Sequence, residues 1–235
     1  MNLVSEPDPY SGRPVGKPVN GAPGALPSAV RLEGRSGRVE KLDADRHGVD
    51  LWQALKDDNS LWPYMAYGPF SDEPTFMAWL AERPRLTDPY SCAIIDNENR
   101  AVGIATLMEI RPAMRVIEVG HIVYSPRLQR TVLATEAQYL LARYVFETLG
   151  YRRYEWKCNA LNAPSRRAAE RFGFTYEGLF RQHMVVKGRN RDTAWFSMLD
   201  SEWPARKAAF ERWLAPGNFD AEGRQIQSLT ALHTR

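Results

Sequence analysis

The segment from Val132 to Leu149 places apolar residues three and four positions apart, which is the spacing of one face of an α-helix. The residues of this face are Ala134, Ala137, Leu140, Leu141, Tyr144, Val145 and Leu149. Gly150 follows, and glycine readily takes the left-handed conformation that ends a helix. The chain therefore contains a long helix whose apolar face must pack against another element.

Strand-like segments flank this helix on both sides. The segment before it, RVIEVGHIVYS, alternates Glu118, Gly120, Ile122 and Tyr124 with Ile117, Val119, His121 and Val123. Both sets are largely apolar, which is typical of a strand inside a sheet. The segment after the helix, YRRYEWKC, also reads as a strand. A strand, helix and strand in succession predict a parallel pair joined by a crossover.

The other segments predict antiparallel strands and shorter helices around that crossover. Hairpins are expected from VRLEGRSGRVEKLD, from YSCAIID through NENR to AVGIATLMEIR, and from FTYEGLFRQHMVVKG through the turn RNRD to TAWFSMLDSEW. Helices are expected in HGVDLWQALKDD with Val49, Trp52 and Leu55 on one face, in EPTFMAWLAERP, in NALNAPSRRAAERFGF and in PARKAAFERWL. The fold class is α/β (α+β): a mixed, mostly antiparallel central sheet with helices on both faces.

The two ends of the chain differ from its middle. Residues 1–27 hold ten glycines and prolines, so we expect an extended arm without regular elements, either disordered or anchored by Val4, Tyr10 and Val15. Residues 28–214 form the expected domain, and 215–235 a polar, mobile tail.

Composition excludes several classes of protein. The net charge of +3, from 31 basic and 28 acidic residues, gives no excess for nucleic-acid binding. Cys92 and Cys158 are far apart and not in a metal-binding spacing, so neither a disulfide framework nor a metal is expected. No apolar run is long enough for a membrane span, and the cytoplasm is the expected location.

The segment SPRLQRTVLATEA, which leads from the strand into the long helix, has the layout of an anion site. Free N–H groups and the positive end of the helix dipole bind phosphate, and Arg127 and Arg130 lie beside them. Basic residues are also common on the solvated first turn of a helix. Both interpretations stay open on these residues alone.

A second segment favours the anion site. IEVGHIVYSPRLQRTVLATEA together with NALNAPSRRAAERFGF resembles the GNAT superfamily of acyl-CoA-dependent N-acyltransferases, in its RimJ/RimL-like branch. The resemblance covers about residues 30–203. It implies acetyl-CoA as co-substrate, with the backbone of Val123 and Tyr124 and the Asn162 side chain along its pantetheine arm. The phosphate turn would comprise Gln129, Arg130, Thr131, Val132, Leu133 and Ala134.

The turn departs from the family at Val132, where a glycine is usual. A β-branched residue is strained at positive φ, so we expect cofactor binding to be weakened or reshaped but retained.

The resemblance also implies roles in catalysis. Many relatives carry a tyrosine acid where this chain has Ala169, and Ser165 would replace it as donor to the departing sulfur. Glu118 lies in an apolar strand, so it is either the base that takes a proton from the acceptor or the partner of an arginine such as Arg111 or Arg115. The alternation sends His121 to the other face, as a core or rim residue.

The acceptor is an amine of a protein N-terminus or of a small molecule, and its wall is expected to include Trp62, Tyr64 and Tyr67, with Tyr176 and His183 as weaker candidates. Aromatic residues such as those of 61–70 are as often part of the core. The alternative function is a catalytically weak acyl-CoA-binding or sensor protein, favoured by Val132 and Ala169. No nucleic acid or membrane partner is expected, and the protein is expected to be a monomer or a homodimer.

Overall fold

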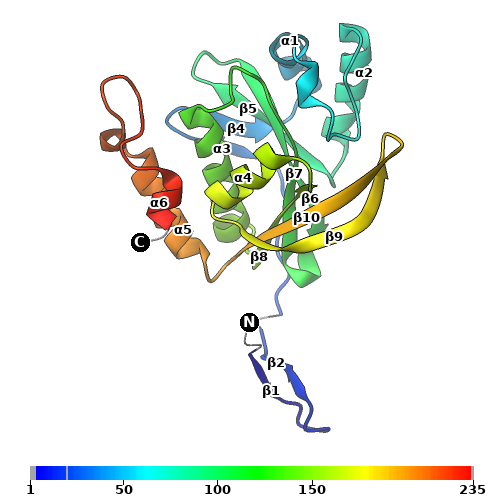
Figure 1. Ribbon diagram of the computed structural model, residues 1–235, viewed down its shortest axis with the longest axis vertical. Helices are drawn as coiled ribbons and strands as arrows, with labels where there is room; N and C mark the ends of the chain where they lie inside the picture. The colour runs from blue at the N-terminus through cyan, green and yellow to red at the C-terminus, as the bar shows by residue number, and fades with distance from the viewer. Residues whose placement is uncertain (1–3, 20, 234–235) are drawn as a thin grey trace.

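The computed structural model describes residues 4–19 and 21–233 and contains one eight-stranded sheet (Figure 1). Each strand is antiparallel to its neighbours except for the parallel pair β7–β8, so the predicted fold class is confirmed. In spatial order the strands are β3 (Arg31–Glu33), β4 (Gly37–Lys41), β5 (Tyr90–Asp96), β6 (Ala101–Arg111), β7 (Val116–Tyr124), β8 (Arg153–Asn159), β10 (Arg189–Leu199) and β9 (Thr175–Val186).

Helices cover both faces of the sheet (Figure 1). On one face, α1 (Ala44–Leu55) and α2 (Glu73–Glu82) enclose a core that includes Ile104 and Val123. The core on the other face includes Ile117 and Val119 and is covered by α3 (Val132–Arg143), α4 (Ala163–Arg171) and α5 (Trp203–Leu214). Sheet positions can therefore be assigned to the α1–α2 face or to the α3–α4 face.

The long helix forms where its spacing predicts it. Thr131 caps α3, which continues through a π-helical turn at Tyr144–Thr148 before Gly150 takes a φ of 72°. Asp43 and Asp72 cap α1 and α2 by accepting backbone N–H bonds. The expected inner face of α1 is wrong at Val49, which is 57% exposed, because Leu51 and Leu55 face the sheet instead.

A charged cluster joins β4 to α1. The carboxylate of Glu40, 3% exposed, accepts bonds from Arg38 and from His47 Nε2 at 2.9 Å each. The Asp43 N–H donates to His47 Nδ1, so Nε2 carries the ring proton of the neutral imidazole. Burial raises the pKa of Glu40, but the bonds from Arg38 and His47 outweigh it and lower that pKa to about 2. The ionised carboxylate is thus part of the fold.

The parallel strands β7 and β8 pair over only part of their length. Val116 to Val119 lie opposite Arg153 to Trp156, and no pairs continue beyond Val119 and Trp156 in the part of the chain described. β7 nevertheless runs on to Tyr124, and β8 to Asn159. The two strands therefore diverge and open a gap within the sheet, next to the start of α3.

A β-bulge at His121 lies beside this gap. Ile104 pairs with Val123 and Thr106 with Gly120, so two residues of β7 oppose one of β6, and His121 has a φ of 47°. Val123 consequently packs in the α1–α2 core, while Ile122 and Tyr124 pack against the other core. The predicted alternation is wrong beyond Gly120: His121 lies on the face of Glu118.

The N-terminal arm contains regular structure that its composition did not predict. β1 (Ser5–Pro7) pairs with β2 (Pro14–Gly16), and this hairpin projects from the domain (Figure 1). The three expected anchors are wrong, because Val4, Tyr10 and Val15 are 69%, 97% and 41% exposed. The arm joins the domain further on, where Gly24 and Ala25 donate backbone bonds to Pro112 and Leu149.

The expectation of a mobile C-terminal tail is also wrong. Residues Leu229–His233 form α6, which packs on α5 and buries Leu229 completely (0% exposed). The domain boundaries at residues 28 and 214 stay a prediction.

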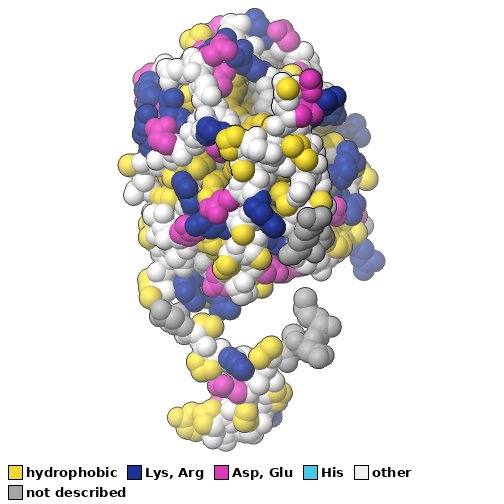
Figure 2. Space-filling view, turned by 90° about the vertical axis from the view of Figure 1, so that its left-hand side faces the viewer, with side chains coloured by type: hydrophobic (Ala, Val, Ile, Leu, Met, Phe, Trp, Pro, Cys, Tyr) yellow, Lys and Arg dark blue, Asp and Glu magenta, His cyan; other side chains and the backbone are white. Residues whose placement is uncertain are grey.

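On the side of the molecule where α5 and α6 lie, basic and acidic side chains are interspersed (Figure 2).

The last hairpin turns earlier than its sequence suggested. The expected turn RNRD belongs to β10, and the chain reverses at Lys187 and Gly188, with φ of 50° and 72°. Two successive positive φ angles are typical of a type I′ hairpin turn. The hairpin tip therefore presents the Lys187 side chain.

Candidate functional site

The start of α3 has the geometry of an anion site. Thr131 Oγ1 accepts the N–H of Ala134 at 3.1 Å. The N–H groups of Val132 and Leu133 occupy the first two helical positions, which have no acceptor within a helix. Among residues 4–19 and 21–233 these two N–H groups have no acceptor, so two free donors lie at the positive end of the helix, next to Gln129 and Arg130 in the chain.

Val132 causes no backbone strain in this turn. Arg130 is the residue with a left-handed φ, of 62°, while Val132 is the first helical residue and packs against the core beneath it. The backbone strain that was expected at Val132 therefore does not occur there, and the left-handed residue lies two positions earlier, at Arg130.

The two arginines beside the turn differ in their freedom. Arg127 bonds to Asp96 and Glu98, both at 3.0 Å, and all three line a hollow of about 310 Å³ beside the start of α3. Arg130 is exposed and has no ion pair within residues 4–19 and 21–233. Only Arg130 is free to neutralise a bound phosphate.

Val123 and Tyr124, which the resemblance places along the pantetheine arm, already have contacts within the chain. Val123 is 2% exposed, and the Tyr124 carbonyl accepts Gln129 Nε2 at 2.8 Å. The Tyr124 hydroxyl accepts a hydrogen bond from Gln138 Nε2 at 2.7 Å, which places it against α3. The Gln129 side chain therefore ties the end of β7 to the turn.

The start of α4 lies across the gap, on the α3–α4 face. Asn162 caps the helix by accepting the Ser165 N–H at 3.1 Å, and no acceptor for its Nδ2 is found in the described chain. Ser165 Oγ accepts from Trp156 Nε1 at 3.0 Å, which puts this hydroxyl beside the last paired step of β7 and β8. Ala169, where relatives carry an acid, is completely buried.

Glu118 occupies the opposite face at the same point of the ladder. Its side chain is 7% exposed and pairs with Lys157 Nζ at 2.9 Å. Its ion-pair partner is thus Lys157, and not Arg111 or Arg115, which the structural alternative had named. Burial raises the pKa of Glu118, Lys157 lowers it, and the result is about 7. At neutral pH this carboxyl is divided between its acid and base forms, which suits proton transfer.

Strand register gathers further side chains around Glu118. Glu118 is paired with Glu155, and Lys157 with Trp195, so all four lie on the α1–α2 face. Lys157 Nζ lies 4.0 Å from the centre of the Trp195 ring. Glu155 is balanced by Arg111 and Arg153, each at 2.7 Å. This leaves Glu118 as the carboxyl with the raised pKa in the cluster.

Tyr64 and Tyr67 lie between α2 and the gap and, together with Trp79 of α2, are called the aromatic wall below. Both tyrosines are predicted acceptor residues. Tyr67 meets the edge of His121 at 5.5 Å and Trp79 at 4.6 Å between ring centroids. Tyr64 donates to the Leu161 carbonyl at 3.2 Å and so spans the gap to α4.

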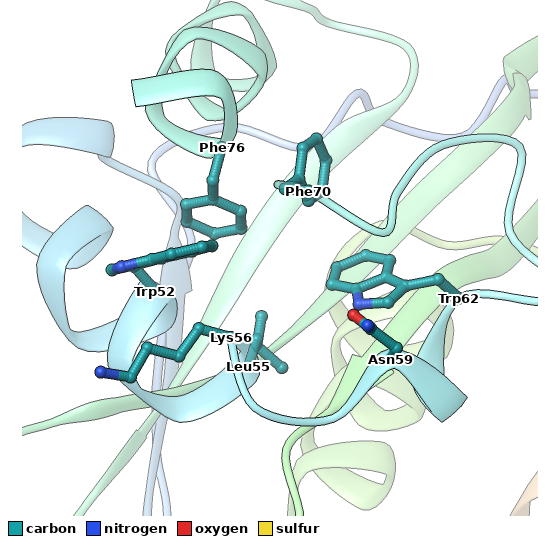
Figure 3. Close-up of a pocket in the computed structure, with 7 residues that line it drawn as sticks. All are labelled: Trp52, Leu55, Lys56, Asn59, Trp62, Phe70 and Phe76. Carbon is teal, nitrogen blue, oxygen red and sulfur yellow. The ribbon is translucent and has the colours of Figure 1, made fainter. Parts of the chain in front are cut away.

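The other two predicted acceptor residues lie elsewhere. Trp62 is 2% exposed and belongs to the core behind the wall (Figure 3). The crevice in that figure has no internal volume for a water molecule. Tyr176 packs on Phe196 of the α3–α4 core and lies beneath Arg166, on the opposite face from Tyr67.

Lys187 joins the hairpin to the aromatic wall. Its ammonium donates to the carbonyls of Trp62, Tyr67 and Gly68 at 2.9, 3.0 and 2.6 Å. One side chain therefore satisfies three backbone acceptors of a loop that lies more than a hundred residues away in the sequence.

Sequence reasoning missed Lys157, Trp195, Arg191 and Lys187. The signal for the first two was present, because Lys157 and Trp195 alternate with apolar neighbours in their strands. Their pairing with Glu118 also needed the register of β8, which single segments do not give.

Two features are absent from the residues that the structure describes. No helix there is long and apolar enough to cross a membrane, and no three His, Cys, Asp or Glu side chains there are grouped to hold a metal ion.

Comparison with known proteins gives consistent matches. Residues 39–175 match the family model described as Acetyltransferase (GNAT) domain. Over 148 residues the chain is 28% identical to the Bacillus subtilis (strain 168) protein YdaF, named as a candidate ribosomal N-acetyltransferase, covering 55% of this chain and 80% of that one.

Two solved structures are also similar. A GCN5-related N-acetyltransferase from Brucella melitensis is 48% identical with a TM-score of 0.89, covering 91% of this chain and 98% of that one. A GNAT-family protein from Chromobacterium violaceum ATCC 12472 is 41% identical with a TM-score of 0.77, covering 84% and 100%. The chain therefore belongs to the GNAT family and is an acetyl-CoA-dependent acetyltransferase.

Proposed function

We propose that the protein transfers an acetyl group from acetyl-CoA to a primary amine, of a protein N-terminus or of a small molecule. The observation that carries this proposal is the Glu118 carboxyl, buried at the last paired steps of β7 and β8 with a pKa of about 7. A carboxyl of this kind accepts a proton from an ammonium group at neutral pH far better than an exposed carboxylate does.

The donor's phosphates would bind at the start of α3, where the N–H groups of Val132 and Leu133 and the Arg130 guanidinium have no partner among the described residues. The Asn162 amide would donate to the arm that reaches into the gap. Because Asn162 also caps α4, one side chain would hold both the helix and the cofactor.

The acceptor nitrogen loses two protons as its ammonium group becomes an amide, and the departing sulfur gains one. Glu118 would take a proton from the acceptor ammonium, and the neutral amine would attack the thioester carbonyl. When the tetrahedral intermediate collapses, the C–S bond breaks and the sulfur leaves as a thiolate. The Ser165 hydroxyl, beside Trp156 on the other face, would donate to that sulfur. The second proton leaves the nitrogen as the amide forms and balances the proton that the thiolate takes up to become CoA thiol, while the proton on Glu118 returns to solvent.

The alternative, a catalytically weak sensor, rested on Val132 and Ala169. Val132 is unstrained, which removes one of its two supports. Ala169 remains the other, because no tyrosine acid stands in its place.

Release of CoA thiol from acetyl-CoA with a panel of primary amines tests the proposal. We expect turnover with at least one amine, and Ser165→Ala is expected to lower kcat for every amine because a donor to the sulfur serves all acceptors. The exposed Arg167 on the same helix, as Arg167→Ala, is the matched control. Stabilisation by acetyl-CoA without thiol release from any amine would favour the sensor instead.

A further inference from the structure

Two arginines near His121, Arg83 and Arg191, have no carboxylate partner among the residues that the structure describes. Arg83 belongs to the 3₁₀ turn Arg83–Arg85 that follows α2, and its guanidinium lies 5.4 Å from the centre of the Trp79 ring. Trp79 packs on Tyr67, which meets the edge of His121. This chain of ring contacts brings Arg83 to the wall of the candidate acceptor site from the side of α2.

Arg191 reaches the site from the hairpin. By register, Arg191, Thr193 and Trp195 lie on the face of Glu118, and Arg191 Nε donates to Thr193 Oγ1 at 3.3 Å. Burial lowers the pKa of Arg191, whereas Cys158 and Glu118 raise it. The half-buried guanidinium is therefore close enough to Glu118 to interact with it, although Glu118 is already bonded to Lys157.

Both guanidinium groups are near enough to His121 for their charges to act on its ring. Burial lowers the pKa of His121, and the charges of Arg83 and Arg191 lower it further. A neutral imidazole therefore balances neither arginine. No carboxylate in residues 4–19 or 21–233 forms an ion pair with either of them.

The carboxylates near Glu118 leave Arg83 and Arg191 without an ion pair. Lys157 is bonded to Glu118 and also lies 3.2 Å from Glu155, which Arg111 and Arg153 hold as well. The exposed Glu109 is near enough to raise the pKa of Glu118, but it forms no ion pair with either arginine in the described residues. Burying a charge without a partner is unfavourable, and arginine's planar fork matches a carboxylate or a phosphate. Two half-buried guanidinium groups without a carboxylate partner in the described residues are therefore available to an anion from outside them.

We propose that Arg83 and Arg191 bind an anionic group, a carboxylate or a phosphate, carried by the acceptor amine. This inference rests on the proposed function and narrows its acceptor to amines with an acidic substituent, as against polyamines or basic peptides. The anion of acetyl-CoA is not the partner, because its phosphates are assigned to the start of α3 on the opposite face and the arm near the thioester is uncharged.

The same cations assist the chemistry. Positive charge near the acceptor lowers the pKa of its ammonium group, so less driving force is needed from Glu118 to remove the proton. The anionic substituent holds the amine in place while the surrounding cations promote its neutral, nucleophilic form.

Matched pairs of acceptors test the proposal through thiol release from acetyl-CoA. One pair is O-phosphoethanolamine and ethanolamine, a second is β-alanine and its amide, and a third is a tripeptide with Asp or Asn in the second position. We expect kcat/KM to be at least tenfold higher for the anionic member of a pair. Comparing kcat/KM for the first two pairs with kcat/KM for the third distinguishes a small-molecule acceptor from a peptide acceptor.

Substitutions connect the preference to the arginines. Arg191→Met and Arg83→Met are each expected to bring the ratio within a pair close to one, and Arg191→Lys to an intermediate value because lysine lacks the fork. Arg189→Met, an exposed arginine on the same strand, is the matched control and is expected to keep the wild-type ratio.

The outcomes separate this proposal from the acetyl-transfer proposal. Equal kcat/KM within every pair, or a preference that persists in both methionine variants, overturns the anion site while transfer stands. If no amine gives thiol release, transfer fails, and the thermal shift of the acetyl-CoA complex with O-phosphoethanolamine decides the anion site alone. A shift that Arg191→Met abolishes supports it, and no shift overturns it.

Discussion

Replacing Glu118 with glutamine separates its role in catalysis from its role in stability. The substitution keeps the shape and hydrogen-bonding capacity of the side chain and removes only the charge. Lys157 keeps a carboxylate neighbour in the variant, because its Nζ is also 3.2 Å from Glu155. The variant is therefore expected to fold.

The stability difference between the two proteins must depend on pH. Burial raises the pKa of Glu118 from its ordinary 4.5 to about 7, so the folded state holds this proton more tightly than the unfolded chain does. The stability that comes from the bound proton is complete below pH 4.5 and is lost as pH rises through 7. The rise in pKa corresponds to about 3 kcal/mol.

Urea unfolding of wild type and Glu118→Gln across pH 4.5 to 8 measures this difference. The free energy of unfolding of the wild type should fall relative to the variant by about 3 kcal/mol over that range. A difference that stays constant with pH would refute the argument that burial dominates the carboxyl's environment.

Activity gives an independent measurement on the same variant. For wild type, kcat/KM should rise with pH through a midpoint near 7, and Glu118→Gln should lose this limb and about 10²- to 10⁴-fold in rate at pH 8. The loss should be greatest for alkylamines, with an ammonium pKa near 10.4, and mild for α-amino groups near 7.7 to 8.0. An intact limb in the variant would move the base to His121 or His183.

Three further outcomes follow from the structure. Arg130→Gly should raise the stability of the free protein by about 1 kcal/mol, because glycine relieves the left-handed φ at this position. The same variant should show a smaller rise in Tm with acetyl-CoA. Arg127→Gly should leave that rise nearly intact, because Arg127 is already ion-paired in the wild type. Because the folded pKa of Glu40 is held at about 2, the advantage of wild type over Glu40→Gln should shrink as pH falls from 4.5 towards 3, as measured by denaturant unfolding. Leu229→Ala should lower the free energy of unfolding by about 2 to 5 kcal/mol, whereas a mobile tail would give no change.

The regular parts of this fold could be read from the sequence because local periodicity specifies them. The spacing of Leu140, Leu141 and Val145 gives α3. Strand alternation also placed Glu118 correctly in a buried strand.

The features that failed depend on contacts between distant segments. The bulge at His121 is a property of the β6–β7 pair, so the sequence of β7 alone gave the wrong face. The tail looked mobile because it is polar, yet Leu229 and Leu232, three residues apart, suffice to dock one helical turn. The partner of Glu118 was sought among arginines close in sequence, whereas Lys157 comes from a neighbouring strand.

The hydrogen bonds from Lys187 to the loop beside the candidate acceptor site require the β9–β10 hairpin to keep its length. The ammonium meets the carbonyls of Trp62, Tyr67 and Gly68 only because β9 and β10 carry it to the far end of the hairpin (Figure 1). An insertion or deletion of one residue in either arm would turn the tip or withdraw it by about 3.3 Å, beyond hydrogen-bonding reach. Homologues that handle acceptors of another size should therefore differ in the side chains of the 62–68 loop while keeping the number of residues in the hairpin fixed.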